Sequence, residues 1–90
     1  MTTLTVTDAA AAAINAQLKK LGADDYIPAI VWAEDDDGRG EWEVGYHKIT
    51  EVPKSFVTNI GGLRIVIEPH WSSALDRKTL DVVNGHFKVR

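Results

Sequence analysis

The chain opens with an alanine-rich stretch in which apolar residues recur at every third or fourth position. This spacing places them on one face of a helix, at Ala10, Ile14, Leu18 and Leu21. Thr7 stands where a threonine side chain caps a first helical turn, and Gly22 stands where helices commonly end. We therefore predict a helix from Asp8 to Leu21, preceded by a short strand from Leu4 to Val6, and expect the helix to pack closely on a sheet.

From Pro28 onwards the pattern changes to one typical of β-strands. The apolar run from Ile30 to Ala33 predicts a buried strand, and strict alternation from Glu41 to Lys48 predicts a second one. The apolar positions of the second strand are Trp42, Val44 and Tyr46. The acidic segment EDDDGRGE lies between the two strands and is predicted to be a hairpin loop.

The second half of the chain continues with strands and one short helix. The predicted elements are a strand at Ser55 to Thr58, a turn at 59–62, a strand at Leu63 to Ile67 and a helix from Pro69 to about Leu75. A last hairpin is predicted because Asn84-Gly85 separates the apolar strands at 79–83 and 86–89, and both turn positions of such a hairpin need positive φ angles. In its last strand, Phe87 and Val89 are expected to point inward and His86 and Lys88 outward.

Composition limits the possible function classes. With 90 residues, the chain forms one domain, residues 1–90. It has no cysteine, which excludes a disulfide, a thiolate nucleophile and cysteinyl ligation of a metal or cluster. No apolar run reaches the ~20 residues that span a bilayer, and the first residues lack the pattern of a signal peptide. We expect a soluble, cytoplasmic protein without membrane contact.

Charge is unevenly distributed along the chain. Residues 1–43 carry nine acidic and three basic side chains, and residues 44–90 carry four acidic and seven basic ones. This asymmetry can steer a protein partner. The basic residues are scattered and form no patch, so nucleic-acid binding is not expected.

Two segments carry a resemblance to a known family. The opening LTVTDAAAAAINAQLKKLG resembles the start of the A-type iron–sulfur carriers, the HesB-like family, and GGLRIVIEPHWSSALDRKTLDVV followed by NGHFKV resembles their second half. The resemblance covers most of the chain in order, with a loose match over residues 23–55. It implies an α+β fold: a small β-sandwich of mixed or antiparallel strands with one main N-terminal helix and one short helix.

The family's chemistry is not expected here. Its activity rests on three cysteines, one in the loop of the first hairpin and two in a tail after the last strand. In this chain the loop reads DDDGRG, from Asp35 to Gly40, and the sequence ends at Arg90 before any such tail. Hard carboxylates are poor replacements for thiolates on iron–sulfide clusters. We therefore expect no cluster, no other cofactor and no functional residue shared with the family.

The acidic loop is the first candidate site. Its carboxylates suit a hard cation such as Ca²⁺, Mg²⁺ or Mn²⁺, with Asp35, Asp36, Asp37 and Glu41 as ligands. The segment departs from a calcium-binding EF-hand loop, because Arg39 replaces the third acidic position and Tyr46 the final glutamate. The favoured interpretation is a solvated hairpin loop, with cation binding as the alternative.

The tryptophans form the second candidate site. Three indoles in 90 residues is a high content, and Trp is enriched both in cores and at binding surfaces. The predicted interaction surface consists of Trp32, Arg39, Trp42 and Trp71. Burial of one or two indoles in the core is the favoured interpretation; an exposed indole beside acidic residues would suit a basic partner through cation–π contact.

Catalytic signals are weak. The three histidines show no ligand spacing and are expected on the surface, with convergence of His47 and His86 left open. Glu68 and Asp81 are interpreted as isolated carboxylates, and no acid–base pair stands out. We predict a non-enzymatic binding or interaction module with a protein partner. The alternatives are a hard-cation-binding domain and an enzyme of unknown reaction, and the oligomeric state is open.

Overall fold

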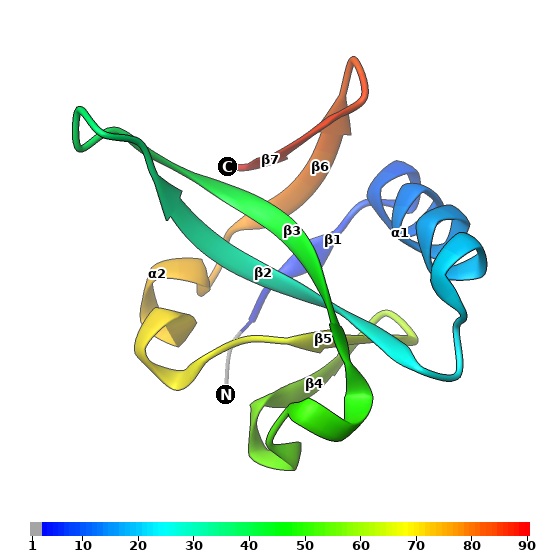
Figure 1. Cartoon of the computed structure of the whole chain (residues 1–90). Coiled ribbons are helices and arrows are strands. Elements are labelled where there is room, and N and C mark those ends of the chain that lie inside the picture. Colours follow the sequence, from blue (N-terminus) through cyan, green and yellow to red (C-terminus); the bar gives the residue numbers. More distant parts are fainter. Residues whose placement is uncertain (1–2) are drawn as a thin grey trace.

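The computed structural model describes residues 3–90 and folds them into an α+β domain with two mixed sheets (Figure 1). The three-stranded sheet has the order β1-β6-β7, with β1 (Thr5–Val6), β6 (Thr79–Val83) and β7 (His86–Val89). The four-stranded sheet has the order β3-β2-β5-β4, with β2 (Tyr26–Glu34), β3 (Gly40–Lys48), β4 (Val57–Ile60) and β5 (Leu63–Val66). The α-helices are α1 (Asp8–Leu21) and α2 (Ser72–Leu75).

Helix α1 has the predicted bounds and the predicted cap. The Thr7 side chain accepts a hydrogen bond from the Ala10 N–H at 3.2 Å, and Gly22 ends the helix with a φ of 110°. Ala10, Ile14 and Leu18 are buried as expected. The prediction was wrong for Leu21, which is exposed because the last turn lies past the core and borders a surface pocket.

Strands β2 and β3 form the predicted hairpin, in which Trp32 lies opposite Trp42 and Glu34 opposite Gly40. Strand β2 begins at Tyr26, before the predicted start at Ile30. The predicted burial from Ile30 to Ala33 was wrong beyond Ile30, because the hairpin extends past the core and leaves Trp32 exposed. Asp25 and Ile49 share a ladder hydrogen bond, and bonded pairs alternate along an antiparallel ladder. Pro28 therefore stands at a position whose nitrogen points away from β3, so its missing N–H costs that ladder nothing.

The segment from Ile49 to Ile60 differs from its prediction. It contains two 3₁₀ turns, η1 (Ile49–Glu51) and η2 (Lys54–Phe56), so the expected strand at Ser55 and Phe56 was wrong. Pro53 precedes η2 and its carbonyl accepts the Phe56 N–H, which closes a local turn in place of a strand. Strand β4 consequently starts later and runs to Ile60, and the following turn contains only Gly61 and Gly62, both with positive φ.

The last third of the chain matches its predicted order. Pro69 opens a 3₁₀ turn, η3 (Pro69–Trp71), that continues into α2. Asn84 and Gly85 connect β6 and β7 with φ angles of 53° and 80°, as the two-residue hairpin requires. Phe87 and Val89 pack against the core, whereas His86 and Lys88 are exposed, which confirms the alternation.

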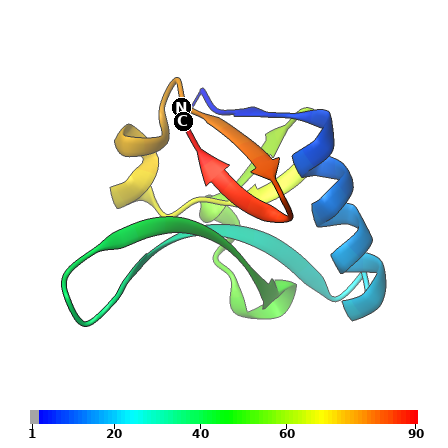
Figure 2. The same cartoon turned by 90° about the horizontal axis from the view of Figure 1, so that it is seen from above.

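Both sheets contribute to one main core. Its most deeply buried side chains come from α1, both sheets and α2, and are Ile14, Ile30, Ile65, Leu75 and Leu80. A second, smaller cluster of Ile27, Ala29 and Val66 is packed against Val52 and Phe56 of the 49–56 segment. Figure 2 shows α1 along one side of the molecule and the β2–β3 hairpin extending away from it. No helix within residues 3–90 is long and apolar enough to cross a membrane.

Candidate functional site

A concave region lies between the β2–β3 hairpin and the β6–β7 hairpin. It is an open pocket of about 640 Å³, which we call the interhairpin pocket. Its lining residues are Trp32, Gly40, Glu41, Trp42, Val83, Phe87, Lys88, Val89 and Arg90. A pocket with an apolar lining and a few charged groups is the usual form of a binding site.

Three indoles form a continuous row beside this pocket. The ring centroids of Trp32 and Trp42 are 5.0 Å apart with an interplanar angle of 69°, and those of Trp42 and Trp71 are 5.9 Å apart at 90°. These edge-to-face arrangements are favourable because the positive edge of one ring meets the negative face of the next. Trp42 and Trp71 also pack against the core, whereas Trp32 is 38% exposed. The structure thus combines the core interpretation with the surface interpretation of the tryptophans.

The position of Trp32 depends on Gly40 and Glu34. The indole lies directly over Gly40, where a Cβ atom would come within 3.0 Å of three indole atoms. The indole Nε1–H donates a hydrogen bond to Glu34 at 3.0 Å, which fixes the ring orientation at the surface. The glycine therefore provides the space that lets an exposed aromatic surface lie flat on the hairpin.

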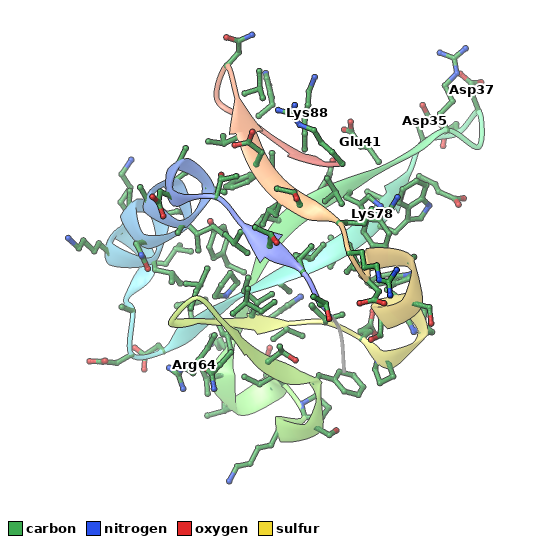
Figure 3. All side chains as sticks on the ribbon, turned by 180° about the vertical axis from the view of Figure 1, so that it is seen from behind. Asp35, Asp37, Glu41, Arg64, Lys78 and Lys88 are labelled. Carbon is green, nitrogen blue, oxygen red and sulfur yellow. The ribbon has the colours of Figure 1, made fainter. Side chains whose placement is uncertain are left out.

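Charged side chains of both signs border the interhairpin pocket. Glu41 comes from β3 and Lys88 from β7, and Figure 3 shows both between the two hairpins. Arg90 is held by a 2.9 Å ion pair with Asp81. Glu41 and Lys88 make no hydrogen bond or ion pair within residues 3–90, so both charges are available to a ligand.

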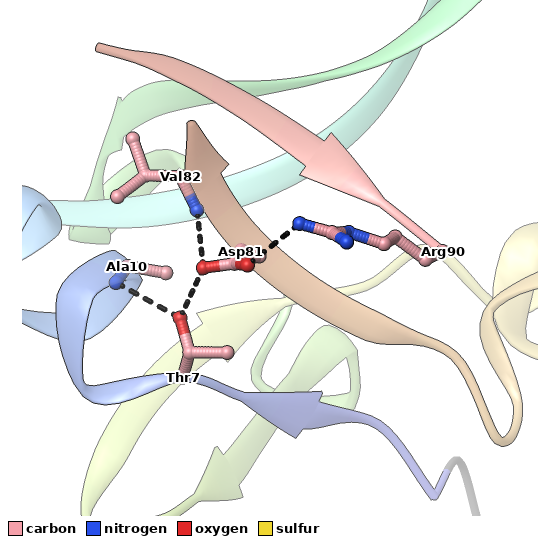
Figure 4. Close-up of polar contacts among 5 residues, drawn as sticks. All are labelled: Thr7, Ala10, Asp81, Val82 and Arg90. Atoms are coloured by element: carbon pink, nitrogen blue, oxygen red, sulfur yellow. Dashed lines mark hydrogen bonds and ion pairs between the residues drawn. The ribbon is translucent and has the colours of Figure 1, made fainter. Parts of the chain in front are cut away.

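Asp81 was expected to be isolated, and this prediction was wrong. Its Oδ1 accepts hydrogen bonds from the Thr7 hydroxyl and the Val82 N–H, each at 2.8 Å, and its Oδ2 pairs with Arg90 (Figure 4). The Thr7 hydroxyl, the largest cause, lowers the pKa of Asp81, assisted by Val82 and Arg90. The carboxylate links the cap of α1 to the β6–β7 hairpin, a role that only the tertiary contact between β1 and β6 creates.

The acidic loop has a local structural role. Asp35 Oδ1 accepts the N–H groups of Asp37 and Arg39 at 3.0 and 2.9 Å and so closes the loop at the hairpin tip. Within residues 3–90 no three His, Asp or Glu side chains are arranged to hold a metal ion. Asp35 and Asp37 lie at the tip, and Glu41 lies further down the hairpin (Figure 3). Cation binding by Asp35, Asp36, Asp37 and Glu41 stays a prediction.

Arg39 and the histidines lie apart from the indole row. Arg39 borders a separate depression with Glu34, Asp35 and Glu43, so it does not join the tryptophans in the interhairpin pocket. His47 and His86 are exposed and border different pockets, which contradicts their convergence. His70 lies against Trp71 with ring centroids 4.5 Å apart.

Sequence reasoning missed the contribution of β7 to the site. Phe87, Lys88 and Val89 line the pocket, although only the inward and outward orientation of this strand was predicted. The alternation of basic and apolar residues in HFKVR was the available signal. This alternation could not indicate which surface β7 would face, because the β3 residues across the pocket, such as Trp42, lie about 45 residues earlier in the chain.

Comparisons with known proteins give no further guide to the site. No protein-family model matches the chain, and no curated protein matches its sequence.

Proposed function

We propose that this domain is a cysteine-free relative of the HesB-like iron–sulfur carriers and serves in the cytoplasm as a non-catalytic interaction module, with the interhairpin pocket as the site where a protein partner binds. In this proposal the fold of the carriers, a small β-sandwich with one main helix, is retained and the cluster is not.

The proposed relation to the HesB-like carriers is supported by the order of the helices and strands and by the position of two residues. The resemblance places the family's cysteines in the loop of the first hairpin and after the last strand. In this chain Gly40, at the end of that loop, and Arg90, after the last strand, line the same pocket. Two positions that are distant in sequence therefore meet at one site, as a shared ligand site in the family would require.

The observation that carries the binding role is the exposed indole of Trp32 within this pocket. Trp32 and Leu21 are the exposed large apolar side chains of the described residues, and Trp32 alone of the two lines the interhairpin pocket. Trp is enriched at the energetic centre of interfaces, because it offers a large apolar area with a polar N–H. The unpaired charges of Glu41 and Lys88 beside it add polar contacts for orientation.

A protein partner is favoured because free strand edges border the pocket. β3 and β7 are both edge strands, and no ladder joins them within residues 3–90. Asp35 and Arg39 are a hydrogen-bonded pair, and bonded pairs alternate, so the backbone N–H and C=O groups of Trp42 and Val44 point away from β2. Unpaired edges of this kind accept extended segments of other proteins.

Site-specific photo-crosslinking in cells tests the proposed interaction. A p-benzoylphenylalanine residue at position 32 is expected to form an adduct with a defined partner, and the same residue at position 20, on the exposed end of α1, is not. Lys88→Glu should weaken the adduct because it reverses a charge in the pocket, whereas the matched change Lys20→Glu should leave it unchanged. Equal adducts at both positions, or none at position 32, would refute the interaction role.

Anaerobic reconstitution with ferrous iron and sulfide tests the loss of cluster carriage separately. After desalting, we expect no stable visible absorbance and substoichiometric iron, because the chain contains no thiolate ligand. A stable brown protein with near-stoichiometric iron and sulfide would overturn this part of the proposal without bearing on the crosslinking result.

A further inference from the structure

A second pocket lies on the side of the four-stranded sheet that carries the smaller core cluster. It has a volume of about 290 Å³ and lies between β2, β5 and the 49–56 segment. We call it the outer pocket; the residues that matter below are Val31, His47, Glu51, Val52, Phe56 and Glu68. It shares no lining residue with the interhairpin pocket, so an inference about it does not depend on the proposed function.

The floor and walls of the outer pocket are apolar. Ala29 and Val66 of the second cluster are buried beneath it, and Val31, Val52 and Phe56 pack against that cluster while remaining partly exposed. The 49–56 segment covers only part of this face of the sheet. An apolar surface therefore stays open to a ligand small enough to fit about 290 Å³, near the lower limit of the ~300–1,000 Å³ typical of small-molecule sites.

The carboxylates at the outer pocket are not accompanied by a lysine or arginine in the described part of the chain. Glu51 and Glu68 are among the lining residues of the pocket, and His47 adds an imidazole. Lys54, the only basic residue of the 49–56 segment, is exposed and does not line the pocket.

The carboxylates of Glu51 and Glu68 have no partner among the described residues. Glu51 and Glu68 make no side-chain hydrogen bond or ion pair within residues 3–90, although Glu68 is half-buried. Both carboxylates are therefore open to hydrogen bonds from a ligand. A cationic ligand would supply charged donors for them.

We propose that the outer pocket binds a small hydrophobic amine, with its ammonium group at Glu51 and Glu68 and its apolar group on Val31, Val52 and Phe56. Ammonium–carboxylate hydrogen bonds are stronger than neutral ones. The charge of the pocket excludes carboxylates and phosphates of the same size. The apolar floor favours an amine with a hydrocarbon group over a bare ammonium ion.

Methyl-selective NMR titration with three matched probes tests this proposal. The cation 2-phenylethylamine should produce saturable shifts at the methyl groups of Val31, Val52 and Val66. The neutral isostere 2-phenylethanol and the anion 3-phenylpropionate should bind with an affinity at least about tenfold lower, because each lacks the charge-assisted contacts. Equal affinity for the alcohol would overturn the cation site, as would shifts confined to other regions or the absence of any shift.

Two double variants separate the pocket from general electrostatics. Glu51→Gln/Glu68→Gln should weaken amine binding by about tenfold or more. Asp24→Asn/Asp36→Asn removes the same total charge from exposed positions outside the pocket and should change the affinity by less than about twofold, as expected for screened surface charges. A similar loss in both variants would show that net charge alone attracts the amine and would overturn the proposal. Wild-type chemical shifts elsewhere in the spectrum confirm that each variant is folded.

Discussion

Replacing Gly40 by alanine tests the packing that exposes Trp32. A Cβ atom at this position would come within 3.0 Å of Cζ2, Cε2 and Nε1 of the indole, so the ring must move. Moving it breaks the edge-to-face contact with Trp42, of about 1 kcal/mol, and the exposed hydrogen bond to Glu34, of about 0.5 kcal/mol. Gly40 has no positive φ, so alanine also stabilises the folded strand by about 0.7 kcal/mol, because it loses less backbone entropy on folding than glycine does. The expected net loss is about 1 kcal/mol.

Thermal denaturation followed by circular dichroism measures this loss. For a domain of this size, about 1 kcal/mol corresponds to a Tm lower by roughly 4–8 °C. Gly45→Ala is the matched control on the same strand, because nothing lies within 4 Å of its added Cβ, and it should leave Tm unchanged or raise it.

A double-mutant cycle gives the sharper test of the same packing. In a Trp32→Ala background the indole is absent, so Gly40→Ala should change from destabilising to stabilising, by about 0.7 kcal/mol. The coupling between the two sites should therefore be about 1.5 kcal/mol. If Gly40→Ala destabilises both backgrounds equally, the indole is not what requires the glycine and the reasoning fails.

Three further predictions concern the cap of α1 and the acidic loop. Thr7→Val removes the hydroxyl that accepts from Ala10 and donates to Asp81, so we expect a loss of about 1–2 kcal/mol in urea unfolding, with Thr7→Ser as the near-neutral control. The pKa of Asp81 is lower in the folded state than in the unfolded state, so its stabilisation is complete above the unfolded pKa and is lost as pH falls through the folded one. The stability difference between wild type and Asp81→Asn should therefore narrow below about pH 4, the ordinary range of an aspartate, and a difference that stays constant there would contradict this. Titration with Ca²⁺, Mg²⁺ or Mn²⁺, followed by Trp fluorescence, should give only the unsaturating response of a simple salt; saturation that Asp35→Asn/Asp37→Asn abolishes would favour the cation-binding alternative.

Elements with a local cause could be predicted from the sequence. The α1 cap, its glycine end and the Asn84-Gly85 hairpin each follow from neighbouring residues, and the structure has them where they were expected. The strand prediction at Ser55 and Phe56 was wrong because a short run of residues after a proline fits a strand and a 3₁₀ turn equally well. The α+β class was predictable because helix and strand periodicities were both present.

The candidate sites were predictable only in part. The facing of Trp32 and Trp42 follows from a symmetric hairpin register, but Trp71 joins their row through tertiary packing. The role of Gly40 requires the side-chain position of Trp32, which no sequence pattern contains. The outer pocket exists because the 49–56 segment folds over one face of the sheet. A strand predicted at Ser55 and Phe56 gives no indication that this segment covers that face.

The parallel pairing of β1 with β6 has a consequence for the order in which the chain becomes stable during synthesis. Val6 pairs with Leu80, and the hydroxyl of Thr7, which caps α1, donates a hydrogen bond to Asp81. A nascent chain therefore exposes β1 without a partner strand until β6, more than 70 residues later, has left the ribosome. During that interval the unpaired edge of β1 and the apolar face of α1 stay exposed, and both are surfaces that promote aggregation.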